Sequence, residues 1–288
     1  MIALENSFHV DFLPKLKKPM LIAGFGGWGN ALNVSKGMVG YLIRKFQAKN
    51  FATPNTDLFY RFDETRPVAT INNGYLKSLE MPGGRLFFST PPQSDCDLIL
   101  FETEEPNLRW NQFVAHLIDL CKKLEVTTII TLGSMWDNVL HTDYVVSGIA
   151  SNESLWKTLE PEGVIPIHYQ GPSSINSLII KESAKRGLQC ASLWSHCPYY
   201  LQGSPHYGLM AHLGRLLSKI GGFELDTQEL SSKWEKMLAR FQDLIQKDPN
   251  IQEVVRGMRK AKVKGMVAMQ NKTINNGNLI NLKDFLNS

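Results

Sequence analysis

The sequence predicts an α/β protein with a mostly parallel sheet, helices on the crossover connections and a helical appendage near its C-terminal end. Short apolar runs typical of buried strands alternate with amphipathic segments between about residues 19 and 222. After Gly221 and Gly222 the alternation stops and helical spacing continues alone. We therefore expect an α/β core domain over residues 1–222, a helical appendage over 223–262 and an irregular or mobile tail over 263–288.

Four apolar runs are predicted as the central parallel strands, at residues 19–25, 97–103, 126–132 and 187–194. Each run leads into a turn that carries aromatic or titratable side chains. The carboxyl ends of parallel strands share one edge of an open α/β sheet, and ligands bind at that edge. We therefore expect the side chains that follow these four strands to gather there.

Amphipathic spacing predicts crossover helices over residues 30–49, 113–124, 173–186 and 205–220, with Ser173 or Ser174 as the N-cap of the third. Three runs at 58–62, 75–79 and 85–88 are predicted as short, partly antiparallel strands at one edge of the sheet. Residues 230–245 are predicted as a long amphipathic helix that breaks at Asp248-Pro249. A second helix is expected to follow through about residue 261.

The turn from Glu104 to Trp110 joins a strand to a helix through two acids, a proline, an arginine and a tryptophan. Its carboxylates are candidates for proton transfer or for binding a ribose-like diol. The alternative is that these acids and Arg109 only stabilise the start of the helix. No residue is assigned a catalytic role. The candidate pocket comprises Trp28, Glu104, Glu105, Arg109, Trp110, His141, Tyr169, Trp194 and His196.

Four of the six tryptophans (Trp28, Trp110, Trp136 and Trp194) lie at predicted strand-to-loop transitions. Their ring faces are suited to stacking a flat ligand, or else they cap the edge of the core. His141 and His196 also follow predicted strands, and each is either a ligand or acid–base group or a structural loop histidine.

Several sites with defined motifs are not supported. Gly24–Gly29 fits the pattern G-x-G-x-x-G, but the next acid, Asp57, is farther away than the roughly 20 residues expected for a ribose-binding carboxylate. We expect a tight turn covered by Trp28, whose amides could hold a small anion, and no cofactor. No histidine spacing suits zinc, so no metal is expected. Neither Ser134 nor Ser195 has an evident histidine and acid partner, which argues against a serine hydrolase.

The composition fits a folded protein of the cytoplasm. With 31 basic and 27 acidic side chains the formal charge is +4, which argues against a nucleic-acid partner. No secretory signal and no apolar run of about 18 residues is evident, so no membrane span is expected. The four cysteines read as reduced, mostly buried thiols, and only Cys197 is considered as a nucleophile. A basic cluster is interpreted as a solvated helix face or flexible arm: Arg256, Arg259, Lys260, Lys262 and Lys264.

A set of short motifs, taken in order, resembles the bacterial and archaeal branch of the proteasome assembly chaperone two family over roughly residues 15–250. The motifs are Gly27-Trp28, Phe62-Asp63, Thr65-Arg66-Pro67, Glu105-Pro106, Arg109-Trp110, His141-Thr142, Tyr169, Gly171-Pro172, Leu193-Trp194 and Pro198-Tyr199-Tyr200. The resemblance implies a three-layer α/β/α sandwich of the phosphorylase/hydrolase-like type and assembly into homo-oligomers.

The chain departs from the family pattern in three places. Asn30-Ala31 and Asp143-Tyr144 replace Asp-Ala-Gly and Arg-Pro, which weakens the case for charge-based chemistry shared at these loops. The end of the chain, residues 284–288, lacks the penultimate tyrosine through which some archaeal relatives are thought to dock on proteasome-type rings.

Two functional hypotheses remain open. The first is a homo-oligomeric, non-catalytic protein that acts by association with itself and with another protein complex, like an assembly chaperone or scaffold. The second is a protein or enzyme that binds a nucleoside-like or nucleotide-like molecule in the candidate pocket at the carboxyl edge of the sheet. Fold analogy alone does not establish that chemistry.

Overall fold

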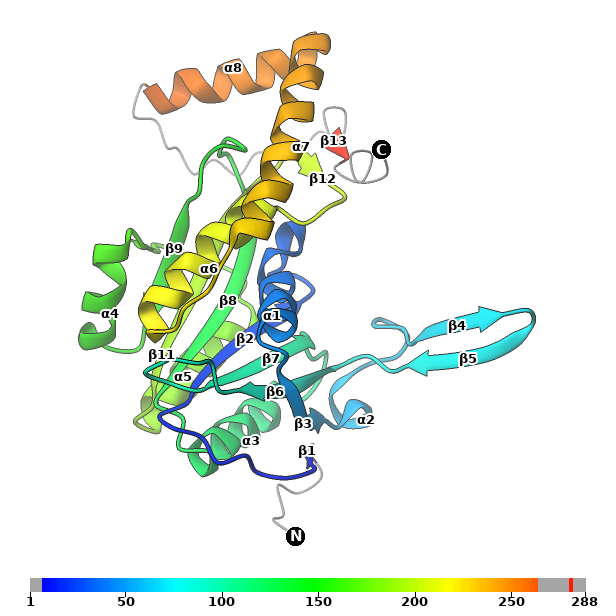
Figure 1. Ribbon diagram of the computed structural model, residues 1–288, viewed down its shortest axis with the longest axis vertical. Helices are drawn as coiled ribbons and strands as arrows, with labels where there is room; N and C mark the ends of the chain where they lie inside the picture. Colours follow the sequence, from blue (N-terminus) through cyan, green and yellow to red (C-terminus); the bar gives the residue numbers. More distant parts are fainter. Residues whose placement is uncertain (1–6, 264–279, 282–288) are drawn as a thin grey trace.

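The computed structural model describes residues 7–263 and 280–281 and is built around one nine-stranded mixed sheet (Figure 1). The strands are β1 (Phe8–Val10), β2 (Met20–Gly26), β3 (Lys49–Pro54), β6 (Gly84–Ser89), β7 (Leu98–Glu104), β8 (Thr128–Asp137), β9 (Val146–Ala150), β10 (Ile165–Pro166) and β11 (Gln189–Pro198). Their order is β1-β3-β6-β7-β2-β8-β11-β9-β10. The four strands β7, β2, β8 and β11 are neighbours and run parallel, so their carboxyl ends share one edge as predicted.

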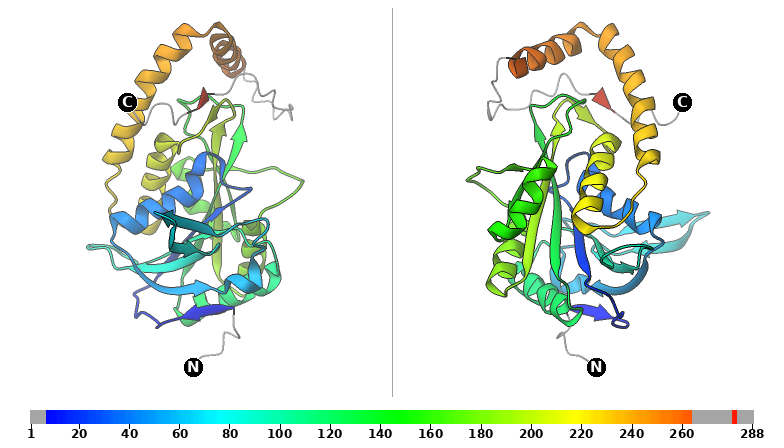
Figure 2. Two further views of the ribbon diagram at one scale, coloured as in Figure 1. Left: turned by 90° about the vertical axis from the view of Figure 1, so that its right-hand side faces the viewer. Right: turned by 60° about the vertical axis from the view of Figure 1, so that its left-hand side comes forward.

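Helices cover both faces of the sheet (Figure 2). The bounds are α1 (Val34–Lys45), α2 (Thr56–Phe59), α3 (Trp110–Lys123), α4 (Glu153–Leu159), α5 (Ile175–Lys185) and α6 (Tyr207–Gly221), with 3₁₀ turns at Ala31–Asn33 and Glu160–Glu162. One face packs against α1 and α6, and the other against α3 and α5. Along β2, Leu21 and Ile22 belong to different core clusters because successive side chains point to opposite faces. The predicted three-layer sandwich is confirmed.

The strands β8 and β11 are longer than predicted, because they pair in unbroken register over ten residues each. They run on to Asp137 and Pro198, past the expected ends at residues 132 and 194. Trp136, Trp194 and His196 therefore lie within strands, where the sequence placed them at or after strand ends.

The region from residue 49 to residue 90 differs most from the prediction. β3 was not predicted, and only its first residue, Lys49, was placed at the end of the preceding helix. Residues 58–62 were expected to form a strand, whereas Thr56–Phe59 is a helical turn. The helix α1 ends early because Gln47 has a φ of 48°, which no α-helix accommodates. The strands β1, β3 and β6 then extend the sheet in antiparallel pairs.

The run at residues 75–79 is not part of the sheet edge as expected. Here β4 (Val68–Asn72) and β5 (Tyr75–Glu80) form a separate two-stranded hairpin that projects from the body of the protein (Figure 1). Its turn is Asn73-Gly74, with φ angles of 51° and 78°. Two consecutive positive φ values are what a two-residue hairpin turn of type I′ requires.

The remaining elements lie beyond β11 and at the C-terminal end. β9 is antiparallel to β11 and parallel to β10, and neither strand nor α4 was predicted. The expected appendage helices are present as α7 (Gln228–Lys247) and α8 (Pro249–Val263), and α7 packs on α6. β12 (Leu201–Gln202) pairs with β13 (Ile280–Asn281). The rest of the predicted tail, with Lys264 of the basic cluster, lies outside the described residues.

The helix α7 of the expected appendage packs on the core. Trp234, Met237 and Phe241 of α7 belong to the same core cluster as α1 and α6. Arg256 and Arg259 of the basic cluster are exposed on α8. Within the part of the chain that is described, no helix has both the length and the apolar character needed to cross a membrane.

Candidate functional site

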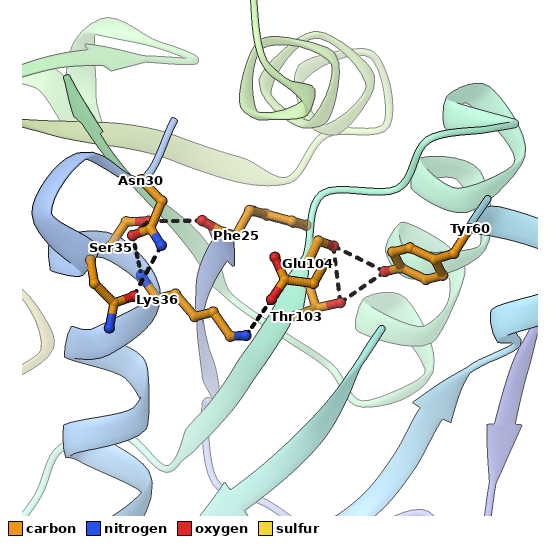
Figure 3. Close-up of polar contacts among 8 residues, drawn as sticks. Phe25, Asn30, Ser35, Lys36, Tyr60, Thr103 and Glu104 are labelled. Atoms are coloured by element: carbon orange, nitrogen blue, oxygen red, sulfur yellow. Dashed lines mark hydrogen bonds and ion pairs between the residues drawn. The ribbon is translucent and has the colours of Figure 1, made fainter. Parts of the chain in front are cut away.

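The loop after β2 is held closed by Asn30 (Figure 3). The Asn30 side-chain oxygen accepts hydrogen bonds from the Ser35 hydroxyl and from the Lys36 backbone N–H, both at 3.1 Å. Gly24 lets α1 approach β2, because a Cβ atom at this position would lie 2.5 Å from the Ser35 carbonyl oxygen. The glycine pattern therefore serves helix–strand packing, as expected for a tight turn.

Glu104 and Glu105 point away from each other, because adjacent residues at the end of a strand face opposite sides of a sheet. Glu104 accepts a 2.5 Å hydrogen bond from the Lys36 ammonium group on the α1 side (Figure 3). Glu105 accepts a 2.8 Å hydrogen bond from the Ile175 N–H at the start of α5, on the other side. Burial raises the pKa of Glu105, and this hydrogen bond opposes the rise. The two acids were expected to stabilise the start of the helix that follows them, α3. Glu105 instead stabilises the start of α5, and Glu104 pairs with Lys36 of α1.

Arg109 and Trp110 complete the turn, and neither is hydrogen-bonded to Glu104 or Glu105 in the part of the chain that the structure describes. Arg109 is the N-cap of α3, has a φ of 54° and makes no side-chain capping hydrogen bond. The Trp110 indole N–H donates to the Pro106 carbonyl at 2.5 Å. The Phe59 carbonyl accepts hydrogen bonds from the Asn107 and Leu108 N–H groups, so α2 fixes the turn.

Replacing Glu105 by alanine is expected to lower the free energy of unfolding by about 1 kcal/mol, because the buried start of α5 loses its acceptor and the favourable charge at its amino end. Glu105→Gln keeps an oxygen acceptor and is expected to cost about half as much. Urea unfolding at pH 7 measures both values. Equal losses in the two variants would contradict the role of the hydrogen bond.

Trp28 and Trp194 meet at the carboxyl edge of the sheet. Their ring centroids are 6.4 Å apart with an interplanar angle of 72°. Trp194 is buried and lies on Gly133 of the adjacent strand, where a Cβ atom would be 2.6 Å from the indole ring. Trp28 is 62% exposed, so its ring is available to a ligand. This pair is the part of the candidate pocket that the structure brings together.

His196 has an acid partner that the sequence analysis missed. Its Nδ1 lies 2.6 Å from Asp137 Oδ2, and its Nε2 lies 2.8 Å from the Ser147 hydroxyl oxygen. The hydrogen bond from His196 lowers the pKa of Asp137. The connectivity is that of a Ser-His-Asp triad. However, Ser147 is only 3% exposed and lies in β9 between β10 and β11, so a substrate has no access to its hydroxyl. The network instead joins β8, β9 and β11.

The other candidate residues have different contacts. His141 is buried against Tyr200 and Phe241, and burial lowers its pKa to about 4. Tyr169 is exposed, and its hydroxyl donates to the Pro172 carbonyl at 2.9 Å. Cys197 is buried, which raises its pKa and makes it a poor nucleophile. In residues 7–263 and 280–281, no group of His, Cys, Asp and Glu side chains could hold a metal ion.

A cleft of about 1500 Å³ lies at the base of the hairpin, on the β1-β3-β6 side of the sheet. Its walls come from residues 8–13, the end of β3, the start of β6 and both ends of the hairpin. Of the predicted pocket residues, only Glu104 contributes to it. This cleft could not be predicted from the sequence, because its walls are assembled from segments far apart in the chain.

Solved structures from several organisms share this fold. A protein of unknown function from Corynebacterium glutamicum is 19% identical over 90% of this chain and 98% of its own, with a TM-score of 0.82. A PAC2 family protein from Streptomyces avermitilis is 25% identical over 82% of this chain and 99% of its own, with a TM-score of 0.73. A proteasome-assembly chaperone homologue from Mycobacterium tuberculosis is 26% identical over the same shares of the two chains, with a TM-score of 0.74.

No protein of curated function matches this chain. The sequence model of the PAC2 family matches residues 21–245, which span the sheet apart from β1, the helices on both of its faces and most of α7. The match covers the motifs on which the resemblance was based, from Gly27-Trp28 to Pro198-Tyr199-Tyr200. The chain therefore belongs to the PAC2 family.

Proposed function

We propose that this protein acts by protein–protein association, as a homo-oligomer of the assembly-chaperone or scaffold type, without catalysis. The observation that carries the proposal is the β4–β5 hairpin. Every residue of its two strands is exposed. Its large apolar side chains, together with the residue that follows β5, are between 43% and 71% exposed: Val68, Ile71, Tyr75, Leu76, Leu79 and Met81.

A projecting hairpin of this composition is unfavourable in water by itself. An isolated two-stranded hairpin is at best marginally stable, and it needs a third strand or a packed surface for support. Clusters of exposed apolar side chains mark surfaces that bind other proteins. The similarity to a proteasome-assembly chaperone homologue also supports a function in protein–protein association. Four buried, unpaired cysteines support a location in the reducing cytoplasm.

The triple variant Ile71→Ser, Leu76→Ser, Leu79→Ser tests the proposal. We expect it to weaken self-association at least tenfold, because it removes most of the apolar area that the hairpin offers to a partner. Light scattering of the purified protein should show a multiple of 32.5 kDa for the wild type and a shift toward 32.5 kDa for the variant. The control is Ile165→Ser, which removes an exposed apolar side chain on β10. An unchanged mass in the triple variant would count against the hairpin.

A second candidate function is binding of a flat, nucleoside-like or nucleotide-like molecule at the carboxyl edge of the sheet. The exposed Trp28 ring beside Trp194 is the observation that favours it. Saturating ligand at a hundredfold its Kd is expected to stabilise the folded protein by about 2.7 kcal/mol. Trp28→Ala should abolish that stabilisation in a thermal-shift titration and leave the oligomer mass unchanged. Dissociation of the oligomer in this variant would assign Trp28 to an interface.

A further inference from the structure

The cleft at the base of the hairpin is large enough for a segment of polypeptide. Its volume of about 1500 Å³ exceeds the roughly 300–1,000 Å³ typical of small-molecule sites. Phe12, Leu13 and Phe87 contribute apolar side chains to the lining of the cleft. Leu79 and Met81 at the base of the hairpin contribute two more. Leu79 and Met81 therefore belong both to the lining of the cleft and to the exposed apolar side chains of the hairpin.

The charges of the cleft and of the hairpin are balanced. The cleft lining carries four basic and four acidic side chains. Residues 68–81 of the hairpin carry one of each, Lys77 and Glu80. A strongly acidic or basic partner would gain little from either surface. A neutral, apolar segment fits the cleft, and the hairpin is a segment of that kind.

One acid in the cleft has no ion-pair partner among the described residues. Glu102 is half-buried on β7, and burial is the main cause of the increase in its pKa. The neighbouring cations Lys36, Arg44 and Arg85 favour its charged form. Of these, Lys36 forms its ion pair with Glu104. A cation that approached Glu102 from the open side of the cleft would complete the neutralisation of this carboxylate. Lys77 is the only cation on the hairpin strands and is exposed.

We propose that the hairpin of one copy of this chain lies in the cleft of a second copy, with Lys77 facing Glu102. The inference rests on the proposed function and identifies the surface of the second copy to which the hairpin binds. In a two-fold dimer, the hairpin of each copy occupies the cleft of the other. Both clefts are then filled, and the dimer has closed symmetry. The exposed side chains of both hairpins are then covered, and each hairpin gains the packed surface that a two-stranded ribbon lacks.

The test uses a photo-crosslinking amino acid in place of Leu76, in full-length protein mixed from ¹⁴N-labelled and ¹⁵N-labelled copies. We expect crosslinks from residue 76 of one isotope to residues 8–13, 53–56 or 84–87 of the other, identified by mass spectrometry. Crosslinks within one copy, or to any other part of the second copy, overturn the inference. If the protein remains oligomeric in that case, the proposed function stands. If it is a monomer without crosslinks between copies, both fail.

Charge reversal gives an independent test. Lys77→Glu and Glu102→Lys are each expected to weaken self-association about tenfold, and the double variant is expected to restore it. Lys181→Glu on α5 is the control, because Lys181 is exposed on the opposite face of the sheet and its reversal should leave the oligomer intact. Circular dichroism and thermal unfolding establish that each variant is folded. Additive losses in the double variant would overturn the pairing of Lys77 with Glu102.

Discussion

Replacing Gly84 by alanine is expected to destabilise the protein by about 3 kcal/mol or more. Gly84 opens β6 opposite Thr103 of β7. A Cβ atom at this position would lie 2.0 Å from the Glu102 carbonyl oxygen and 2.4 Å from the Thr103 Cα. Both are backbone atoms, so relief requires the β6–β7 pair to separate. Because β6 also joins β3 and β1 to the sheet, a local shift would loosen the whole antiparallel edge.

Gly257→Ala is the matched control for this substitution. Gly257 lies inside α8, and a Cβ atom there meets nothing within 4 Å. Since glycine in a helix interior costs roughly 0.5–1 kcal/mol relative to alanine, this variant is expected to be as stable as the wild type or more stable. Urea unfolding monitored by circular dichroism compares the two. A loss below about 1 kcal/mol for Gly84→Ala would show that the strand pair adapts.

The four parallel strands at the centre of the fold could be predicted from the sequence, because each is a short apolar run between amphipathic helices. The strand β2 is buried along its entire length, and the absence of alternation is the signature of a strand covered on both faces. The N-cap of α5 was also predictable: Ser174 accepts a hydrogen bond from the Asn176 N–H. In such segments local pattern and tertiary environment agree.

The antiparallel side was harder to predict for a physical reason. β3 is recognisable only through its partners β1 and β6, since the run that begins at Lys49 carries on from an amphipathic helix without a strong breaker. The hairpin has the composition of a sheet edge, and nothing local shows that it leaves the sheet. Strand assignment depends on pairing across the chain, which propensity does not encode.

Only some of the contacts among the candidate pocket residues could be predicted from the sequence. The parallel strands bring Trp28 to Trp194 at the expected edge. His141 lies elsewhere because the strand extension to Asp137 carries the following loop to the α7 side, against Phe241. The partners of His196 were missed because Asp137 was expected outside a strand and Ser147 lies on a strand that was not predicted. Residues that meet across strands become visible only when the register is known.

Acidification is expected to destabilise the folded protein steeply below about pH 6.5. His141 and His206 are buried, and burial lowers their pKa values to about 4 and about 3, from 6.5 in an exposed histidine. At pH values between the folded-state pKa and 6.5, each of these histidines is protonated in the unfolded chain and neutral in the folded protein. Their contribution to stability is therefore complete above pH 6.5 and is lost as the pH falls through this range. Two protons correspond to a slope of roughly 2–3 kcal/mol per pH unit near pH 5.

The variant His141→Gln separates this effect from that of the carboxylates. Glu102 and Glu105 have raised pKa values, so they take up protons in the folded state first and oppose the loss, whereas Asp137 adds to it at lower pH. These contributions cancel when the pH slopes of wild type and variant are subtracted. The difference near pH 5 is expected to equal about one proton, measured by urea unfolding from pH 7.5 to pH 4.5. Identical slopes would mean that His141 is protonated in the folded protein, and α7 would then pack over a charged ring.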